Sequence, residues 1–148
     1  MKRTLKTLVA VVCAALTLTF ASCTKDAEDL IIGSWQGIEE LVNEQGSDET
    51  EVYVFGETQE VIWTFNKDLT FTMMNKWVDE EHGRSETLNQ NGTYSVKDNK
   101  LTITATYGNE SDTYTLDIDY IDKEGMMLSM TETDGSYGYT MRVRFRRI

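Results

Sequence analysis

The sequence predicts an all-β protein folded as an eight-stranded antiparallel up-and-down barrel. From Glu60 onward, apolar and polar residues alternate with a period of two almost throughout, which is typical of half-buried strands. Short turn-forming segments separate these runs. An even, moderate number of antiparallel strands can close on itself. A two-sheet sandwich would fit the alternation equally well, but it gives no reason for short and longer connections to alternate along the chain.

Eight strands are expected in chain order. They cover residues 34–42, 63–65, 69–73, 92–96, 101–107, 113–120, 125–130 and 137–146. In each strand one set of alternate side chains should be buried and the other solvated. In the strand 113–120, for example, Tyr114, Leu116, Ile118 and Tyr120 form the expected inward set.

The connections predict two different ends for the barrel. Residues 66–68, 97–99 and 122–125 form tight hairpins and make every second connection, so up-and-down order places all three at one end. The intervening connections, at 43–59, 78–91, 108–112 and 133–136, are mostly longer. We therefore expect one closed end and one open end ringed by loops.

The N-terminus resembles the signal of a bacterial lipoprotein. Three basic residues, Lys2, Arg3 and Lys6, precede an uncharged stretch over residues 8–21. Such a stretch is typical of a secretory signal and is short for a membrane-spanning helix. The small residues Ala21 and Ser22 directly before Cys23 resemble a lipobox, in which the signal is cut before a cysteine that is then acylated. An ordinary signal peptide with an incidental cysteine is the alternative.

This interpretation divides the chain into a lipoprotein signal peptide (1–22), an acylated Cys23 with a solvated tether (23–30) and a barrel (31–148). The lipid would be the diacylglycerol and palmitate of bacterial lipoproteins. Because Cys13 would leave with the signal, no disulfide is expected. The expected location is the bacterial outer membrane, with lipid anchorage; exposure on the cell surface and attachment facing the periplasm both remain open.

The charge balance excludes some partners. The chain carries 14 basic and 25 acidic residues, a net charge of −11, and loss of the signal removes only basic residues. Such a surface argues against nucleic-acid binding. A monomer attached to the membrane by its lipid is expected, and the sequence identifies no protein partner.

Three stretches carry a family resemblance: LIIGSW at residues 30–35, WTFNKDLTF at 63–71, and GTYSV with NKLTIT at 92–104. They resemble the bacterial lipocalin-like domain lipoproteins, and Gly33-x-Trp35 matches the lipocalin signature. The resemblance implies that Trp35 plugs the closed end of the barrel and that an arginine of the last strand packs across it. Arg144 or Arg146 is expected to stack there as a cation on a ring.

The lumen is the expected place of function. The candidate ligand-binding residues are aromatic, methionine and amide side chains with lumen parity toward the open end. They are Trp63, Met73, Asn75, Trp77, Tyr107, Tyr114, Met130, Tyr139 and Met141. The same side chains could instead fill the lumen by packing against one another.

Acidic residues gather in the connections of the expected open end. They are Asp48, Glu49, Glu51, Asp79, Glu80, Glu81, Glu110, Asp112, Glu132 and Asp134, with Arg84 as the main opposing charge. A mouth of this sign disfavours anionic ligands, so a small neutral or cationic apolar molecule is expected. The alternative is that these acids only keep the protein soluble.

Catalysis, cofactors and metals are not predicted. His82 is the only histidine, and no phosphate-binding glycine loop, metal-binding cluster or nucleophile motif occurs. The run Asp79 to Glu81 lacks the ligand spacing of a calcium loop. Two functions remain: a barrel that binds or carries a small apolar molecule, and a solid-core barrel that acts as a structural module or contacts proteins or glycans through its loops.

Overall fold

Nine strands and one short helix make up the part of the chain that the structure describes. The structure is a computed structural model that describes residues 26–56, 58–79, 81–135 and 137–148. The elements are α2 (Ala27–Leu30), β1 (Gly33–Glu44), β2 (Glu51–Val54), β3 (Gln59–Phe65), β4 (Thr70–Asp79), β5 (Arg84–Lys97), β6 (Lys100–Tyr107), β7 (Glu110–Ile121), β8 (Gly125–Asp134) and β9 (Tyr137–Arg147). The expected signal peptide and Cys23 lie outside the described residues. Within those residues, no helix has the length and apolar character needed to cross a membrane.

The predicted eight-stranded antiparallel barrel is confirmed. β1 and β3 to β9 pair with their chain neighbours, and pairing of β1 with β9 closes the circuit. β2 is an additional strand that pairs with Glu39–Val42 of β1, inside a segment expected to be a loop. Its four residues are all exposed, so they lack the buried alternation that marks the other strands.

The open end differs from the loop-ringed end that was expected. β5 begins at Arg84, and its residues Arg84–Thr93 pair with β4, so most of residues 78–91 is strand. The outer part of β5 was missed because its side chains from Arg84 to Asn89 are exposed and follow no apolar alternation. Backbone pairing with β4 holds this part of the strand in the sheet.

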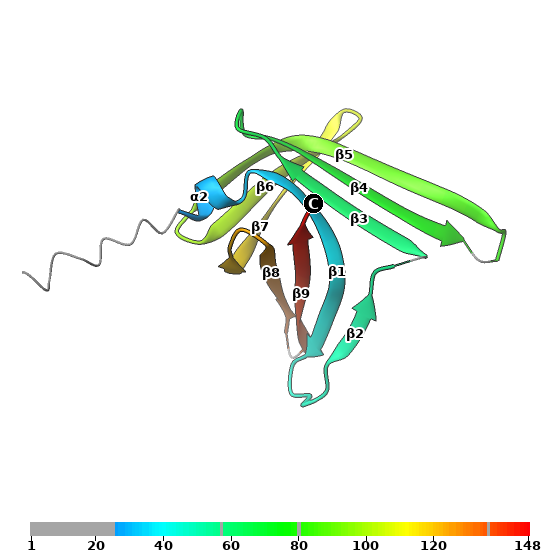
Figure 1. Ribbon diagram of the computed structural model, residues 1–148. Coiled ribbons are helices and arrows are strands. Elements are labelled where there is room, and N and C mark those ends of the chain that lie inside the picture. Colours follow the sequence, from blue (N-terminus) through cyan, green and yellow to red (C-terminus); the bar gives the residue numbers. More distant parts are fainter. Residues whose placement is uncertain (1–25, 57, 80, 136) are drawn as a thin grey trace, which may run out of the picture.

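The barrel wall opens along two seams toward the open end. β1 pairs with β3 only through Gly33–Gln36, and β7 pairs with β8 only through Asp117–Ile121. Beyond these short contacts β3 to β7 form one sheet, and β8, β9, β1 and β2 form another. Figure 1 shows the two groups diverging, with β3, β4 and β5 extending to the right while β1, β8 and β9 run downward.

A β-bulge changes which side chains of β7 face inward. The register of β7 against β8 shifts between Ile118 and Tyr120. Ile118 remains buried, but Tyr120 is 42% exposed. The expectation that Tyr120 belongs to the inward set is therefore wrong, because the extra residue of a bulge reverses the alternation beyond it.

An aromatic layer fills the closed end. Phe65, Phe71 and Phe145 are at most 1% exposed, and the ring of Trp63 lies 5.1 to 6.2 Å from all three by centroid distance. These rings meet mostly edge-on or tilted, an arrangement that aromatic quadrupoles favour. The layer separates the closed end from the space above it.

The segment before β1 is folded onto this closed end rather than forming a solvated tether. Residues 27–30 form α2, Ala27 packs against the core, and Ile31 is fully buried. The last four residues of the expected tether are thus helical, with Ala27 packed against the core and Glu28 and Asp29 exposed. Full burial of Ile31 and partial burial of Ala27 hold this short acidic segment against the fold.

The carboxylate of Asp122 shapes the tight turn between β7 and β8. Its Oδ1 accepts the N–H groups of Glu124 at 2.8 Å and Gly125 at 2.7 Å. These hydrogen bonds, assisted by the charge of Arg147, lower the pKa of the Asp122 carboxyl below its usual 3.8. Ionised Asp122 therefore contributes stability that is fully present above the unfolded pKa and is lost as pH falls through the lower folded pKa.

We expect the melting temperature of Asp122→Asn to fall less steeply in acid than that of the unaltered protein, because asparagine keeps the acceptor oxygen and does not titrate. Thermal melts by circular dichroism between about pH 7 and about pH 2 would measure both slopes. The slope should shrink without vanishing, because the pKa of Asp68 is also lowered, by hydrogen bonds from Thr70. Equal slopes in the two proteins would contradict the assignment.

Candidate functional site

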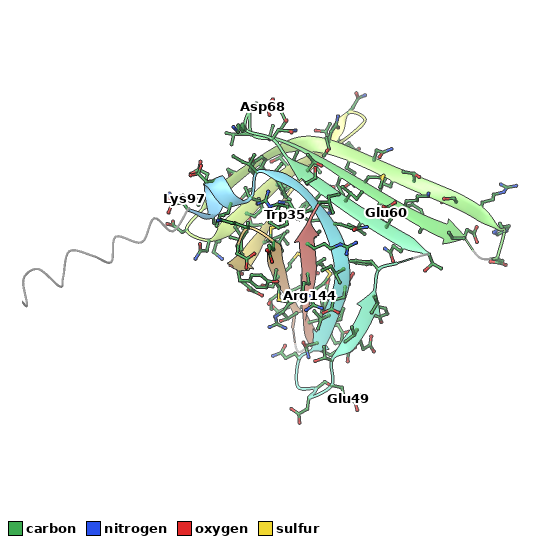
Figure 2. All side chains as sticks on the ribbon, in the orientation of Figure 1. Trp35, Glu49, Glu60, Asp68, Lys97 and Arg144 are labelled. Carbon is green, nitrogen blue, oxygen red and sulfur yellow. The ribbon has the colours of Figure 1, made fainter. Side chains whose placement is uncertain are left out.

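Trp35 plugs the closed end, and its partner is Arg147. Trp35 is fully buried, and its Nε1 donates to the carbonyl oxygen of Ile31 at 2.7 Å. The guanidinium carbon of Arg147 lies 4.2 Å from the centroid of the Trp35 ring. Figure 2 shows Trp35 inside the closed end, with Glu49 at the opposite, open end.

Arg147 also ties together the segments around Trp35. Its Nη1 donates to the Ile32 carbonyl at 2.8 Å, its Nη2 donates to the Leu30 carbonyl, and its Nε donates to the Lys123 carbonyl at 2.8 Å. A Cβ on Gly33 would lie 2.5 Å from Nη1 of Arg147, and Gly33 has a φ of +132°. Glycine is therefore needed at this position both for space and for backbone conformation.

The expectation that Arg144 or Arg146 stacks on Trp35 is wrong. Both lie on the outer face of β9, where Arg144 pairs with Glu39 at 2.9 Å and Arg146 donates to Gln36 Oε1 at 2.6 and 3.0 Å. Strand alternation explains the difference, because Arg147 shares the inward parity of Phe145 and is the register partner of Trp35.

A cavity of about 330 Å³ lies above the aromatic layer. This volume is within the range of pockets that hold small molecules. Its lining comes mainly from β7, β8 and β9. The lining residues are Trp63, Tyr114, Leu116, Leu128, Ser129, Met130, Glu132, Met141, Val143 and Phe145.

The cavity lies at the seam between β7 and β8. Tyr114 and Leu116 come from the part of β7 that has no partner in β8, and Met130 and Glu132 come from the part of β8 that pairs only with β9. Because β7 and β8 separate here, the side chains of these two strands do not meet, and the space between them stays unfilled.

A buried donor on the cavity wall lacks a partner. Nε1 of Trp63 is fully buried, and its N–H donates to no partner among the described residues. An unsatisfied buried N–H costs about 1–3 kcal/mol, so an occupant that carries an acceptor would remove this cost. In contrast, the hydroxyl of Ser129 is already engaged, since it donates to Asp119 at 2.8 Å.

Four of the nine predicted ligand residues line this cavity: Trp63, Tyr114, Met130 and Met141. Met73 lines a separate hollow of about 440 Å³ on the β3–β5 sheet.

Asn75, Trp77 and Tyr139 are not among the described residues that line the 330 Å³ cavity. Asn75 and Trp77 lie on the diverging β4, although Oδ1 of Asn75 is itself buried without a partner in the described part of the chain. The side chain of Tyr107 lies outside what the structure describes.

Sequence reasoning missed most of the apolar wall. Leu116, Leu128, Val143 and Phe145 have the inward parity of their strands, and that alternation was the available signal. The sequence did not show how far along the barrel axis side chains fill the lumen before the cavity begins. Glu132 was assigned to an open-end connection but lies within β8.

Tyrosines and carboxylates pair at the outer end of the cavity and beyond it on the same sheet. The hydroxyls of Tyr139 and Tyr53 donate to Glu132 at 2.8 Å and to Glu51 at 2.5 Å. Each hydrogen bond to a carboxylate raises the pKa of the tyrosine above its usual 10. Tyr139 is the register partner of both Glu132 and Glu44, so these three side chains share one face.

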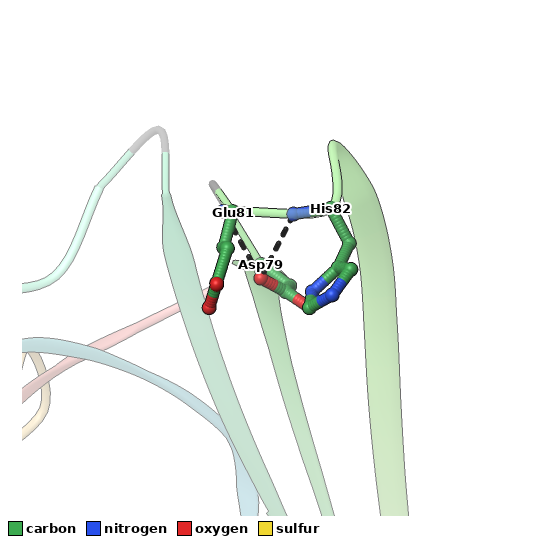
Figure 3. A network of polar contacts seen from close by, with 3 residues as sticks. All are labelled: Asp79, Glu81 and His82. Carbon is green, nitrogen blue, oxygen red and sulfur yellow. Dashed lines mark hydrogen bonds and ion pairs between the residues drawn. The ribbon is translucent and has the colours of Figure 1, made fainter.

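The only histidine has a structural role in a turn. Asp79 Oδ1 accepts the N–H groups of Glu81 and His82 at 3.1 and 3.2 Å, and Asp79 Oδ2 lies 2.7 Å from Nδ1 of His82 (Figure 3). These contacts close the β4–β5 hairpin, at the tip of the diverging sheet. Among the described residues, no group of three or more metal-binding side chains is assembled.

Comparisons with known proteins agree with this architecture. A family model described as a lipocalin-like domain matches residues 31–122. No curated protein sequence matches the chain. A solved lipocalin-like protein from Bacteroides uniformis is 18% identical, with a TM-score of 0.47 over 80% of this chain and 98% of its own.

Two further solved structures extend the comparison. Apocrustacyanin C1 is 15% identical, with a TM-score of 0.52 over 84% of this chain and 64% of its own. The bovine lipocalin allergen Bos d 2 is 15% identical, with a TM-score of 0.48 over 81% of this chain and 74% of its own. At these identities a structural likeness concerns the fold alone. Because the family model matches more than half of its residues, the chain belongs to the lipocalin-like domain family.

Proposed function

We propose that the barrel binds or carries a small apolar molecule. The observation that carries this proposal is the cavity of about 330 Å³, which is mostly apolar and has the unpartnered Trp63 N–H on its wall. Empty apolar space costs stability, and so does a buried donor without an acceptor. A ligand with an apolar body would offset both costs, which is the usual design of a small-molecule pocket.

The charge of the surroundings supports a neutral or cationic ligand. Glu132 lies on the cavity wall, and Glu44 shares its face. A ligand carboxylate would meet these like charges as it entered, and such contacts are unfavourable. We therefore place free fatty acids below neutral and cationic apolar molecules as ligands.

We further propose that the protein acts at the cell envelope, as a lipoprotein anchored in the bacterial outer membrane through acylated Cys23. The basic and apolar segments and the small residues before Cys23 support this proposal. Metabolic labelling with a palmitate analogue should label the full chain but not Cys23→Ser. Equal labelling of both proteins would contradict the attachment site.

Binding rather than catalysis is the proposed role of the cavity. Its wall is largely apolar, the Ser129 hydroxyl donates to Asp119, and His82 belongs to a hairpin at the tip of the other sheet. An arrangement of this kind supports retention of a ligand through burial and a few hydrogen bonds.

The test of the proposed function is native mass spectrometry of residues 26–148, purified without denaturation from the bacterium that produces the protein. We expect a stoichiometric small molecule that is released on unfolding and identified by extraction into organic solvent. A mass without any adduct, together with no binding of the neutral fluorescent probe N-phenyl-1-naphthylamine, would contradict the proposal.

A second candidate function has its own observation. The hollow of about 440 Å³ includes the outward-facing side chains of Ile62, Thr72 and Met74. A partner protein or glycan could contact this outer surface even if the lumen holds no ligand. An apo mass in the experiment above would favour this alternative.

A further inference from the structure

Glu132 is the one carboxylate among the described residues that line the cavity. The ion pairs within the described part of the chain join other groups and do not include Glu132. Its described hydrogen-bonding partner is the hydroxyl of Tyr139, at 2.8 Å. An ionised carboxylate has about four acceptor positions, so most of its capacity is available to a ligand.

The polar and apolar parts of the cavity lie at opposite ends. Leu128 and Phe145 belong to the buried core at the inner end, whereas Glu132 is exposed near the end of β8. Glu132 follows Leu128 by four residues, which separates the two positions by about 13 Å along the strand. This length is comparable to that of an extended ten-carbon chain.

The surroundings of Glu132 add negative charge. Tyr139 stands between Glu132 of β8 and Glu44 of β1 in the register of the sheet. Tyr137, two residues before Tyr139 on the same face of β9, donates to Glu44 at 3.2 Å. Two carboxylates on either side of one tyrosine attract an organic cation through their charge.

We propose that the occupant of the cavity is an amphiphile with a protonated amine at one end, which Glu132 binds while the apolar body extends toward Leu128 and Phe145. This inference rests on the proposed function, because it assigns a head group to the molecule that the barrel binds. Trp63, whose Nε1 has no partner among the described residues, lines the same cavity.

The experiment compares three ligands with the same chain and different head groups. Decylamine, decanol and decanoate are titrated against the domain loaded with N-phenyl-1-naphthylamine, at neutral pH and below their micelle concentrations. We expect decylamine to displace the probe at about one-tenth of the decanol concentration, and decanoate to be the weakest. The titration is repeated in about 0.5 M salt, which screens distant charges but not charges in direct contact. We expect the order of the three ligands to persist, because the amine contacts Glu132 directly.

Glu132→Gln should remove the amine preference, bringing the decylamine and decanol midpoints to within about twofold. The matched control is Glu124→Gln, which removes the same charge from an exposed turn at the closed end and should keep the preference. Decylamine no stronger than decanol, or a preference unchanged in Glu132→Gln, would overturn the amine assignment and leave the proposed binding function intact. Absence of probe binding in the unaltered protein would instead overturn the proposed function, and the amine assignment with it.

Discussion

Replacing Trp35 by alanine should lower the free energy of unfolding by about 3–5 kcal/mol, the range measured for removing a buried aromatic side chain. Trp35 is fully buried and holds the Ile31 carbonyl through its indole N–H. Its loss would leave a cavity at the closed end and expose the faces on which Arg147 and the core residues pack. Urea unfolding followed by circular dichroism would measure the change.

Arg147→Lys and Arg147→Ala separate two contributions of Arg147: the cation over the Trp35 ring and the hydrogen bonds to three backbone carbonyls. Lysine keeps the charge over the ring but cannot form the fork of hydrogen bonds to Leu30, Ile32 and Lys123. We expect Arg147→Ala to cost about 2–4 kcal/mol and Arg147→Lys about half of that. The matched control is Arg146→Ala on the outer face, which should cost less than about 1 kcal/mol. A loss at Arg146 as large as that at Arg147 would contradict the assignment of the plug.

Filling the cavity should abolish binding while the barrel stays folded. Met141 lines the cavity from β9, opposite Met130 in the register of β8. In Met141→Trp the larger ring would occupy space that a ligand needs, and we expect at least about a hundredfold weaker binding of N-phenyl-1-naphthylamine. Because the ring enters space that is already empty, the cost in stability should stay below the usual 1–3 kcal/mol of overpacking.

The control for this variant is Thr140→Trp, which adds the same ring to the opposite face of β9. Thr140 pairs with Thr131 through a hydroxyl contact of 3.0 Å on the outer wall. Probe binding should be retained there within about threefold. Equal loss in both variants, or undiminished binding in a folded Met141→Trp protein, would contradict the location of the site.

The fold could be predicted from the sequence because its main signals are local. Alternation of apolar and polar residues identified the strands, and turn residues such as Asp98 and Asn99, both with positive φ, identified the hairpins. β2 and the outer half of β5 were missed because exposed strand residues carry no burial pattern. Backbone pairing with a neighbouring strand defines those segments, and that pairing is not local.

The site could be predicted only in part. Alternation along a strand is a local property, and four of the residues that it places on the inward face, Trp63, Tyr114, Met130 and Met141, line one cavity. The arginine that covers Trp35 was missed because the expected last strand ended at residue 146, although Arg147 shares the inward parity of Phe145. Alternation also did not show that Tyr120 faces outward, because the bulge in β7 arises from its pairing with β8.

The sequence by itself determined the strand order, the closed end and the sign of the charge around the mouth, since these follow from residue pattern, turn length and composition. Only the tertiary structure decided where the lumen is empty. That depends on two short contacts, β1 with β3 and β7 with β8, beyond which the sheets part. Whether neighbouring strands stay paired is a balance of packing between residues far apart in the chain, and no local pattern encodes it.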